Sequence, residues 1–483
     1  MQTKVLSAKM YVLGDWVSGT KTFDVFDPQS NEMIARVPKA SAEFVENVIT
    51  QAAEAFRSIS SWPTHERINV LQRAADYIEE YHERYAYTIA REGSKTITEA
   101  RGEVSRTVQT LRISAEEARR IKGETINFDQ REGSENRTGY YFRFPIGVVA
   151  AITPFNDPLN LVAHKVGPAL AAGNPVVLKP ASVTPLSALM LAEAFDQAGV
   201  PRGFLSVVTG SGRELGDALV SHPEVKMVSF TGGTNAGNRI TEKAGLKKLG
   251  MELGSNSPVI VMKDADLHDA VKSTVSGAFA AAGQNCLGVQ RVFIEEALFE
   301  DFTELFAERT KELEVGDKQS EWTDVGPLIN EQEAERIEEW VQEAVDAGAK
   351  VLHGGKRNGA YYDPTVLIDV PHSCRLYYEE VFGPVVMLES VGSIQEAVQA
   401  ANDVDYGLQA GIFTSNIDHA FYAVHHLHVG GVMVNDSSDY RVDEMPFGGV
   451  KKSGIGREGV AYAIEEMTEQ RVVCFKIAQP WSQ

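Results

Sequence analysis

The sequence predicts an α/β fold with two parallel sheets, each covered by helices. After residue 147, short apolar segments rich in β-branched residues alternate with segments that have the length and spacing of helices. A second alternation of the same kind begins near residue 256. Apolar strands that alternate with helices are typical of parallel sheets buried on both faces. The chain of 483 residues has the length of two or three domains.

The segment before the first alternation is predicted to be helical. "SAEFVENVITQAAEAF" begins with a serine that can cap a helix, and its apolar residues recur at intervals of three and four. "RINVLQRAADYIEEYHERYAYTIARE" continues this pattern. We therefore expect helices over residues 41–122.

The first sheet is predicted from "GVVAAITP", "PVVLKP", "LSVVTG" and "VKMVSFTG". Ligands of parallel sheets bind at the carboxyl ends of the strands. The expected helices cover residues 159–172, 185–198, 213–221 and 235–245. The expected strand ends cover residues 153–156, 179–182, 210–212 and 231–233.

The second sheet is predicted from "PVIVM", "QRVFIEE", "PVVMLES", "AGIFTSN" and "GVMVND". Helices are expected up to residue 281, near 297–313 and near 331–347. The tail "QRVVCFKI" has the pattern of a single strand. A lone terminal strand needs a partner edge, so we expect it to pair with another subunit or domain.

Charge and cysteine content exclude several kinds of function. The formal net charge is -21, without a basic stripe, which disfavours nucleic acid and anionic membranes as partners. Cys286, Cys374 and Cys474 are odd in number and far apart, so neither a disulfide framework nor a cysteine zinc site is expected, and we expect no metal. The N-terminus lacks the pattern of a signal peptide, and no apolar run reaches the roughly 18 residues of a membrane span. These features predict a cytoplasmic protein.

Three residues with the chemistry of a nucleophilic enzyme lie at predicted strand ends or loops. Cys286 lies in "GQNCLG", where a thiol among small and polar neighbours is a candidate nucleophile. Glu252 lies between Met251 and Leu253, and a carboxylate in a partly apolar setting has the raised pKa of a general base. Asn156 is an amide that can donate to a developing oxyanion. The alternatives are an inert cysteine, a glutamate facing water and a turn asparagine.

Two further features suit a phosphate-bearing ligand. "SFTGGTNAGNRI" reads as strand, glycine turn and helix, and a helix N-terminus with free amides favours a phosphate. Lys179 follows a strand and can donate to ribose or phosphate oxygens. A tight turn and a solvated lysine are the structural alternatives.

Together, these residues identify a family resemblance. The motifs "TPFN", "LKPA", "FTGGT", "MELGSNSP", "GQNC", "EEVFGPV" and "PFGGVKKSGIGREG" follow in the order and spacing of the NAD(P)-dependent aldehyde dehydrogenases. The resemblance covers essentially the whole chain. Within the family, the sequence is most similar to the lactaldehyde dehydrogenase-like branch. It implies two Rossmann-type parallel-sheet domains and a small β segment for bridging and oligomerisation.

The resemblance implies a role for each catalytic candidate. Cys286 attacks the aldehyde carbon, and the side chain of Asn156 and the backbone N–H of Cys286 hold the oxyanion. Glu252 activates the water that hydrolyses the thioester to a free acid. Lys179 matches the lysine on the adenosine ribose. A CoA-acylating semialdehyde dehydrogenase is the alternative enzyme, and a catalytically silent protein on the same fold is the alternative of another class.

The resemblance also implies which residues hold NAD or NADP. Glu380 matches the glutamate on the nicotinamide ribose, with Phe382 beside it. Ser182 replaces a glutamate that many NAD-preferring relatives have, so both cofactors stay open. The remaining contacts are Thr153, Pro154, Phe155 and Asn156 beside the nicotinamide, Gly212 and Gly216 beside the adenine, Phe230, Thr231 and Gly233 at the pyrophosphate turn, and Glu252, Leu253 and Gly254 at the strand end.

The substrate is expected to be a short polar aldehyde, hydroxylated or anionic, of the lactaldehyde or glyceraldehyde type. Arg106 and Arg441 occupy positions where two arginines could pair with a carboxylate or phosphate. His164 is a further pocket candidate. Asn285 stands where relatives that act on anionic semialdehydes often have arginine. The alternatives are surface or salt-bridged arginines and a satisfied core histidine.

By the same resemblance, residues 1–118 and 140–252 form the dinucleotide-binding domain, and residues 253–436 form the catalytic domain. Residues 119–139 and 437–483 form the bridging segment, with part of the substrate-mouth loop. The sequence supports a hairpin here, because "GETINFDQ" and "TGYYFRFPIG" flank a polar turn. The resemblance implies a homodimer or homotetramer in which hairpin and tail pair between subunits.

Overall fold

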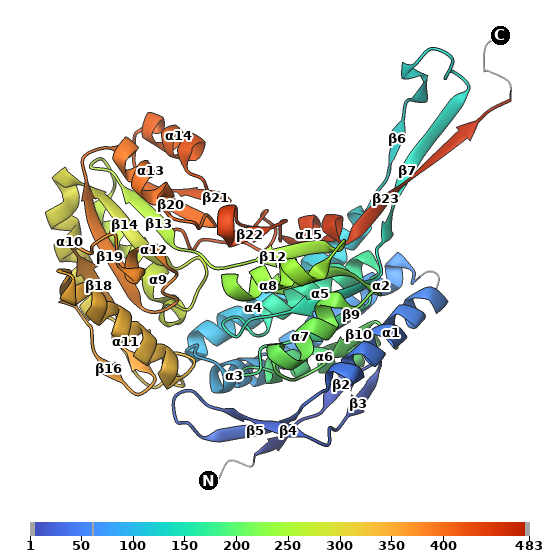
Figure 1. The fold of residues 1–483 in the computed structure, drawn as a ribbon, viewed down its shortest axis with the longest axis horizontal. Coiled ribbons are helices and arrows are strands. Elements are labelled where there is room, and N and C mark those ends of the chain that lie inside the picture. The colour runs from blue at the N-terminus through green and yellow to red at the C-terminus, as the bar shows by residue number, and fades with distance from the viewer. Residues whose placement is uncertain (1–4, 60–61, 479–483) are drawn as a thin grey trace.

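The computed structural model describes residues 5–59 and 62–478. Figure 1 shows two α/β bodies side by side and a narrow β arm that extends away from the larger body. The larger body is built on a sheet of eight strands and the smaller body on a sheet of seven, while the arm is a sheet of three strands. The predicted α/β class is confirmed.

The first sheet has a parallel centre and antiparallel edges, in the order β22-β12-β11-β8-β9-β10-β2-β3. The central strands are those that the sequence predicts, joined by β12, whereas the edge strands were not predicted. The central strands are β8 (Val148–Ile152), β9 (Val176–Lys179), β10 (Leu205–Val207), β11 (Val225–Thr231) and β12 (Lys248–Glu252), and the edges are β2 (Met10–Val12), β3 (Asp15–Val17) and β22 (Gly454–Ile455).

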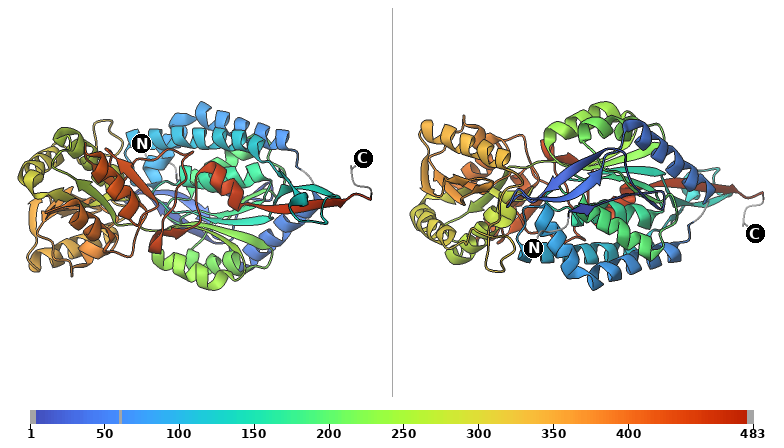
Figure 2. Two further views of the ribbon diagram at one scale, coloured as in Figure 1. Left: turned by 90° about the horizontal axis from the view of Figure 1, so that it is seen from above. Right: turned by 90° about the horizontal axis from the view of Figure 1, so that it is seen from below.

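Helices cover both faces of this sheet, as Figure 2 shows. Successive residues of β8 point to opposite faces, so Val149 and Ala151 belong to one apolar core and Val148 and Ala150 to the other. One face is covered by α2 (Thr64–Glu80), α3 (His82–Glu92), α4 (Ile97–Arg120), α5 (Asn160–Ala172), α6 (Leu186–Ala198) and α15 (Val460–Glu466), and the other by α1 (Ala42–Ser58), α7 (Gly212–Ser221) and α8 (Thr234–Ala244).

The second sheet has the order β15-β18-β19-β14-β13-β20-β21. Its strands are β13 (Ser257–Val261), β14 (Val289–Glu295), β15 (Lys350–His353), β18 (Thr365–Ile368), β19 (Val385–Val391), β20 (Gln409–Phe413) and β21 (Gly431–Val434). Its helices are α9 (Leu267–Phe279), α10 (Glu296–Lys311), α11 (Glu331–Asp346), α12 (Arg375–Tyr378), α13 (Ile394–Asn402) and α14 (Ile417–His426).

One predicted helix is shorter than expected. The helix over "STVSGAFAAAG" was predicted to run to about residue 281, but α9 ends at Phe279. Ala281 and Ala282 then adopt left-handed backbone conformations, with φ of 52° and 54°. Local propensity favours a helix in this alanine-rich segment, so contacts from elsewhere in the fold must hold the turn.

The arm joins a hairpin to the tail. It contains β6 (Glu124–Ile126), β7 (Arg137–Pro145) and β23 (Thr468–Lys476), and β23 pairs antiparallel with β7 along its whole length. The tail strand therefore finds its partner in the hairpin of its own chain. The strand β7 crosses residue 140, and β22 and α15 lie with the first body. The domain limits given above stay a proposal.

The remaining strands form small sheets that were not predicted, namely β1 (Leu6–Ser7), β4 (Thr22–Phe26), β5 (Met33–Pro38), β16 (Arg357–Asn358) and β17 (Tyr361–Tyr362). Within residues 5–59 and 62–478, no helix has both the length and the apolar character needed to cross a bilayer.

Candidate active site

A cavity of about 840 Å³ contains most of the predicted site residues. It is lined by the ends of β8, β11 and β12 in the first body and by the loop before β14 in the second. The carboxyl ends of parallel strands thus form one wall, as expected for an α/β ligand site. The predicted residues that line it are Thr153, Pro154, Phe155, Asn156, Phe230, Thr231, Gly233, Glu252, Leu253, Gly254, Cys286, Glu380 and Phe382.

The other predicted residues lie outside this lining. Lys179 is buried and its Nζ donates to the carbonyl of Pro180 at 2.9 Å, while the hydroxyl of Ser182 donates to the carbonyl of Gly210 at 2.9 Å. Burial lowers the pKa of Lys179 to about 8. Gly212 and Gly216 lie in α7, where an added Cβ would meet open space. These placements leave their cofactor roles as proposals.

Cys286 is a partly buried thiol on the cavity wall. Burial, together with the carboxylates of Glu380, Glu252 and Glu458, raises its pKa to about 12, whereas Arg441 acts in the opposite direction. The thiol is therefore protonated at neutral pH in the protein alone. To act as a nucleophile, it needs a group that removes its proton.

Glu252 ends β12 and is buried, and its Oε2 has no hydrogen-bond partner among the described residues. Burial and the negative charge of Glu458 raise the pKa of Glu252 well above its ordinary value, against the opposing charges of Arg441 and Lys165. A buried carboxyl with a free oxygen and a raised pKa has the properties of a general base.

A cluster of buried charges lies behind Glu252, and sequence reasoning missed two of its members. The Nζ of Lys165 donates to Glu458 Oε1 at 2.8 Å and to Ser229 Oγ at 3.3 Å. Burial opposes the charge of Glu458, but Lys165, His164 and Arg441 outweigh it and lower its pKa to about 2. Glu458 lies in the motif "GIGREG" and Lys165 follows His164. Both residues therefore lie beside positions that the sequence analysis named, but no role was predicted for either.

His164 is a buried residue with a partner. Its Nε2 lies 2.8 Å from Asp443 Oδ1. Burial and the charge of Arg441 lower the pKa of His164, so the ring is neutral at neutral pH and donates to Asp443. The histidine is thus part of the packed wall, as the structural alternative stated, rather than an open polar group.

The guanidinium of Arg441 is buried and incompletely paired. It lies over the ring of Phe447 at 3.7 Å from the centroid, and its Nη2 is 3.6 Å from Glu458 Oε2, beyond a hydrogen bond. Its Nε and Nη2 have no hydrogen-bond partner within the described part of the chain. Two donors of Arg441 are therefore left without a hydrogen-bond acceptor among these residues, which is uncommon for buried polar atoms.

Arg106 and Asn285 differ from Arg441. The Nη2 of Arg106 donates to both oxygens of Asp157, at 2.9 and 3.1 Å, and its side chain is 41% exposed. Arg106 is therefore the salt-bridged arginine of the structural alternative. The Oδ1 of Asn285 accepts from the backbone N–H of Leu287 at 3.1 Å, and the residue lines a small crevice with Glu380 and Phe382 instead of the main cavity.

The cavity also fits a dinucleotide. The helix α8 begins at the cavity after Gly233, without a side-chain cap, so amides of its first turn are free for a phosphate. Glu380 is half-buried and accepts from the backbone N–H of Ser255 at 2.9 Å, and desolvation raises its pKa to about 7. The rings of Phe155 and Phe382 meet edge to face, with centroids 5.8 Å apart.

Two open α/β sheets that share one cavity, with an uncapped helix N-terminus at its rim, form the kind of site at which α/β proteins bind dinucleotides. The model of the aldehyde dehydrogenase family matches residues 16–473, and the chain belongs to this family. It is an NAD(P)-dependent aldehyde dehydrogenase.

Similar proteins agree with this assignment. The chain is 47% identical over 475 residues to the 3-sulfolactaldehyde dehydrogenase of Priestia megaterium, covering 98% of this chain and 99% of that one. It is 40% identical over 468 residues to the lactaldehyde dehydrogenase of Methanococcus maripaludis (strain C5), covering 96% and 99%. The predicted resemblance to the lactaldehyde dehydrogenase branch is thus confirmed.

Solved structures are similar over the same length. Aldehyde dehydrogenase 21 from Physcomitrella patens, in complex with the reaction product succinate, has a TM-score of 0.96 at 40% identity, covering 98% of this chain and 99% of that one. The NADP-dependent glyceraldehyde-3-phosphate dehydrogenase from Bacillus halodurans, in complex with NADP, has a TM-score of 0.95 at 40% identity, covering 98% and 100%. The predicted use of NAD or NADP is confirmed.

Gly254 provides a test of Glu380. A Cβ on Gly254 would lie 2.3 Å from Glu380 Oε2, so we expect Gly254→Ala to displace the glutamate and lose its bond to Ser255. Because the end of a side chain can swing, the fold should survive, while NAD(P) affinity falls about tenfold or more, the scale of one hydrogen bond to a charged group. Isothermal titration measures this affinity.

The matched control is Gly102→Ala in α4, where an added Cβ meets nothing within 4 Å. An alanine inside a helix should raise the free energy of unfolding by about 0.5–1 kcal/mol and leave NAD(P) binding unchanged. Unchanged affinity in Gly254→Ala would remove Glu380 from the cofactor site.

Proposed function

We propose that this dehydrogenase oxidises short polar aldehydes whose far end carries a carboxylate, sulfonate or phosphate, and releases the free acid. Such substrates are the anionic members of the lactaldehyde or glyceraldehyde type. The observation that carries the proposal is Arg441, whose Nε and Nη2 are buried without a hydrogen-bond partner among the described residues. The names of three similar proteins support it, since they refer to sulfolactaldehyde, succinate and glyceraldehyde 3-phosphate, whereas the lactaldehyde of a fourth is uncharged.

In the proposed reaction, the Cys286 sulfur forms a bond to the aldehyde carbon. The negative charge passes to the aldehyde oxygen, where the Asn156 amide and the backbone N–H of Cys286 donate hydrogen bonds. Bound NAD(P) would supply the hydride acceptor, so that loss of hydride from the carbon on sulfur leaves a thioester on Cys286. The thiol first loses its proton to solvent, a step that burial opposes because it raises the thiol pKa.

Glu252 then serves as the base for hydrolysis. Its free Oε2 accepts a proton from water, the water oxygen bonds to the thioester carbon, and the C–S bond breaks to return the thiolate. The negative Glu458, held by Lys165, keeps the proton affinity of Glu252 high. This arrangement favours water over CoA as acceptor, because the base is present in the chain itself.

Glu252→Gln tests the hydrolytic step. The variant should reduce NAD(P)⁺ once per Cys286 in a burst and then turn over about a hundredfold or more slowly, because the thioester forms without a base to clear it. Stopped-flow absorbance of the reduced cofactor measures burst and steady state. Cys286→Ala is the control and should show no burst. A wild-type enzyme that turns over fully only when CoA is added would contradict the free-acid product.

The same base predicts the pH dependence of turnover. Glu252 acts only when deprotonated, and its pKa is raised, so steady-state turnover should be lost as the pH falls through that raised pKa. The burst amplitude of Glu252→Gln should not show this loss at acidic pH. An acid limb at the ordinary pKa of a solvent-exposed glutamate would show that burial does not govern the base.

Arg441→Ala tests the anionic tail. We expect kcat/KM to fall about ten- to a hundredfold for an aldehyde with a carboxylate, sulfonate or phosphate, the range of a hydrogen bond to a charged group, and less than about twofold for a neutral aldehyde of similar size. Arg106→Ala is the matched control, because its guanidinium is already paired with Asp157. An equal loss on both kinds of aldehyde would contradict the anion site.

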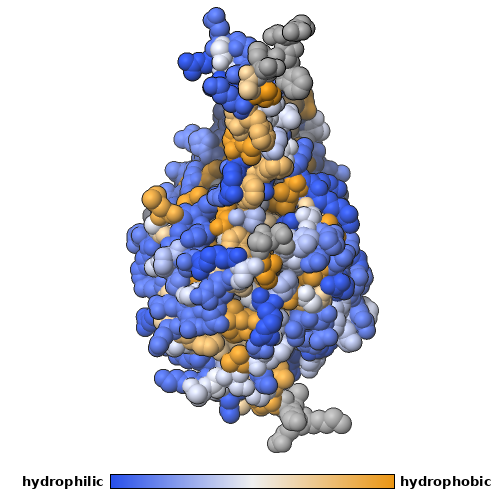
Figure 3. All heavy atoms as spheres, turned by 90° about the vertical axis from the view of Figure 1, so that its right-hand side faces the viewer, coloured by the Kyte–Doolittle hydropathy of each residue, from blue (hydrophilic) through white to orange (hydrophobic). Residues whose placement is uncertain are grey.

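We also propose that the enzyme is a homo-oligomer in which the arm contacts a second copy. The arm is a single layer of three strands, and a sheet buries an apolar face only against another element. Phe142, Val472 and Phe475 are about half exposed on it, and Figure 3 shows apolar side chains along this part of the surface. In the second body, the edge strand β21 and the helix α14 expose a matching apolar strip of Val434, Ile417, Phe421 and Val424.

Val472→Asp should therefore shift the protein toward the monomer, because a charge on the arm would be buried in the contact. Analytical ultracentrifugation measures the mass. Val351→Asp is the control, since Val351 is exposed on β15 at the opposite edge of the second sheet. A wild-type protein that sediments as a monomer would end the proposal.

A further inference from the structure

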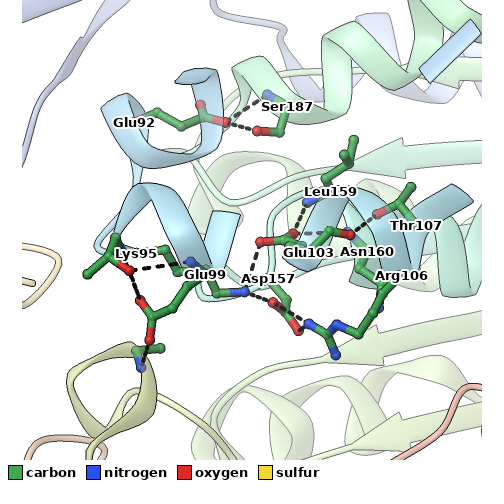
Figure 4. Close-up of polar contacts among 12 residues, drawn as sticks. Glu92, Lys95, Glu99, Glu103, Arg106, Thr107, Asp157, Leu159, Asn160 and Ser187 are labelled. Carbon is green, nitrogen blue, oxygen red and sulfur yellow. Dashed lines mark hydrogen bonds and ion pairs between the residues drawn. The ribbon is translucent and has the colours of Figure 1, made fainter. Parts of the chain in front are cut away.

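The helix α4 contacts both loops that carry the proposed reactive groups. Figure 4 shows its acidic side chains among their partners. Glu103 accepts from the backbone N–H groups of Leu159 and Asn160, at 2.8 and 3.0 Å, just beyond the loop with Asn156. Glu99, one helical turn earlier, accepts from the backbone N–H of Ala281 at 2.6 Å, just before the loop with Cys286. One helix of the first body therefore holds both loops.

The loop before Cys286 contains a left-handed turn. Ala281, Ala282 and Gly283 have φ of 52°, 54° and 68°. This conformation costs free energy at the two alanines, because the Cβ approaches the following carbonyl oxygen. Gly283 has no Cβ, and one added there would lie 2.1 Å from the carbonyl oxygen of Gly383. Such a turn persists only where contacts outside it over-determine its geometry.

Glu99 supplies the contact at the start of this turn. Its Oε1 accepts from Ala281, while its Oε2 accepts from the backbone N–H and the hydroxyl of Thr96 at 2.9 and 3.2 Å. A charge-assisted bond of 2.6 Å to a backbone amide is short for its kind. At the end of the turn, the Nε2 of Gln284 donates back to the carbonyl of Ala281 at 3.0 Å.

We propose that Glu99 is a positioning residue, whose carboxylate holds the left-handed turn at Ala281 and thereby sets the place of the Cys286 thiol in the cavity. The proposal rests on the proposed role of Cys286 as nucleophile. It explains why an alanine-rich segment leaves the helical conformation, and it makes the geometry of the thiol in the second body depend on a helix of the first.

The experiment separates this role from helix capping. Glu99→Ala removes both contacts, whereas Thr96→Ala removes the capping hydroxyl and leaves Glu99 free to bind Ala281. Alkylation of Cys286 by iodoacetamide is followed against pH by the mass of its peptide, so Cys374 and Cys474 do not interfere. Turnover and thermal unfolding are measured on the same proteins.

In Glu99→Ala, we expect kcat to fall about tenfold, since a small misplacement of a reacting group has effects of this size or larger. The KM for NAD(P) should change less than about twofold. The pH midpoint of alkylation should move down by about one unit, because the thiol leaves its buried place. Thr96→Ala should lower the melting temperature and keep kcat and the midpoint of the wild type.

A rescue variant tests the cause. In Glu99→Ala with Ala281→Gly, glycine adopts positive φ without a steric cost, so most of the lost kcat should return. Glu99→Met keeps the side-chain volume and replaces Glu99→Ala if the latter does not fold. Wild-type kcat and midpoint in the Glu99 variants, equal effects in Thr96→Ala, or failure of the glycine to rescue would each overturn the proposal.

The alkylation series also keeps the two proposals apart. It needs no aldehyde and no cofactor, so it reports on Glu99 even if the wild-type protein oxidises no anionic aldehyde. In that case the proposed substrate class fails, while a shifted midpoint in Glu99→Ala still supports the positioning role.

Discussion

The buried carboxylates Glu252 and Glu458 set the electrostatics of the site. Two nearby carboxylates without solvent cannot both carry a charge at low cost. Lys165 donates to Glu458 at 2.8 Å and stabilises its negative form, and this charge adds to the burial that raises the pKa of Glu252. The negative Glu458 also adds to the burial that raises the pKa of the Cys286 thiol. The protein alone therefore holds the Cys286 thiol protonated at neutral pH, and it makes Glu252 a stronger base than a solvent-exposed glutamate.

The second constraint is that the cavity lies between two bodies, so each body must place its residues against the other. Glu252 ends a strand of the first sheet, and its position follows from the register of β12 beside β11. Cys286 belongs to a loop of the second body and has no strand to fix it. Loops before a strand are free to vary, which is why contacts from α4 matter more for the thiol than for the carboxylate.

The sequence predicted the sheets well because their signal is local. The strands β8, β9, β11 and β14 are short apolar runs. Such runs are typical of buried strands in parallel sheets, whatever the rest of the fold. The turn at Ala281 was missed for the opposite reason, since its cause is a carboxylate 182 positions away in the chain. The charge cluster was missed likewise, because Lys165 and Glu458 are 293 positions apart and only the fold brings them together.

The site residues themselves fall into two groups by the same logic. Residues at strand ends, such as Asn156, Glu252 and Gly233, line the cavity where the motif spacing placed them. The pairing of the polar candidates beyond the motifs could not be read from spacing. Arg106 and His164 are matched by Asp157 and Asp443, while Arg441 lies near Glu458, whose Oε1 already binds Lys165. The Arg441 guanidinium lies 3.6 Å from Glu458 and stacks on Phe447, and the proposed anion site depends on its donors not being used within the chain.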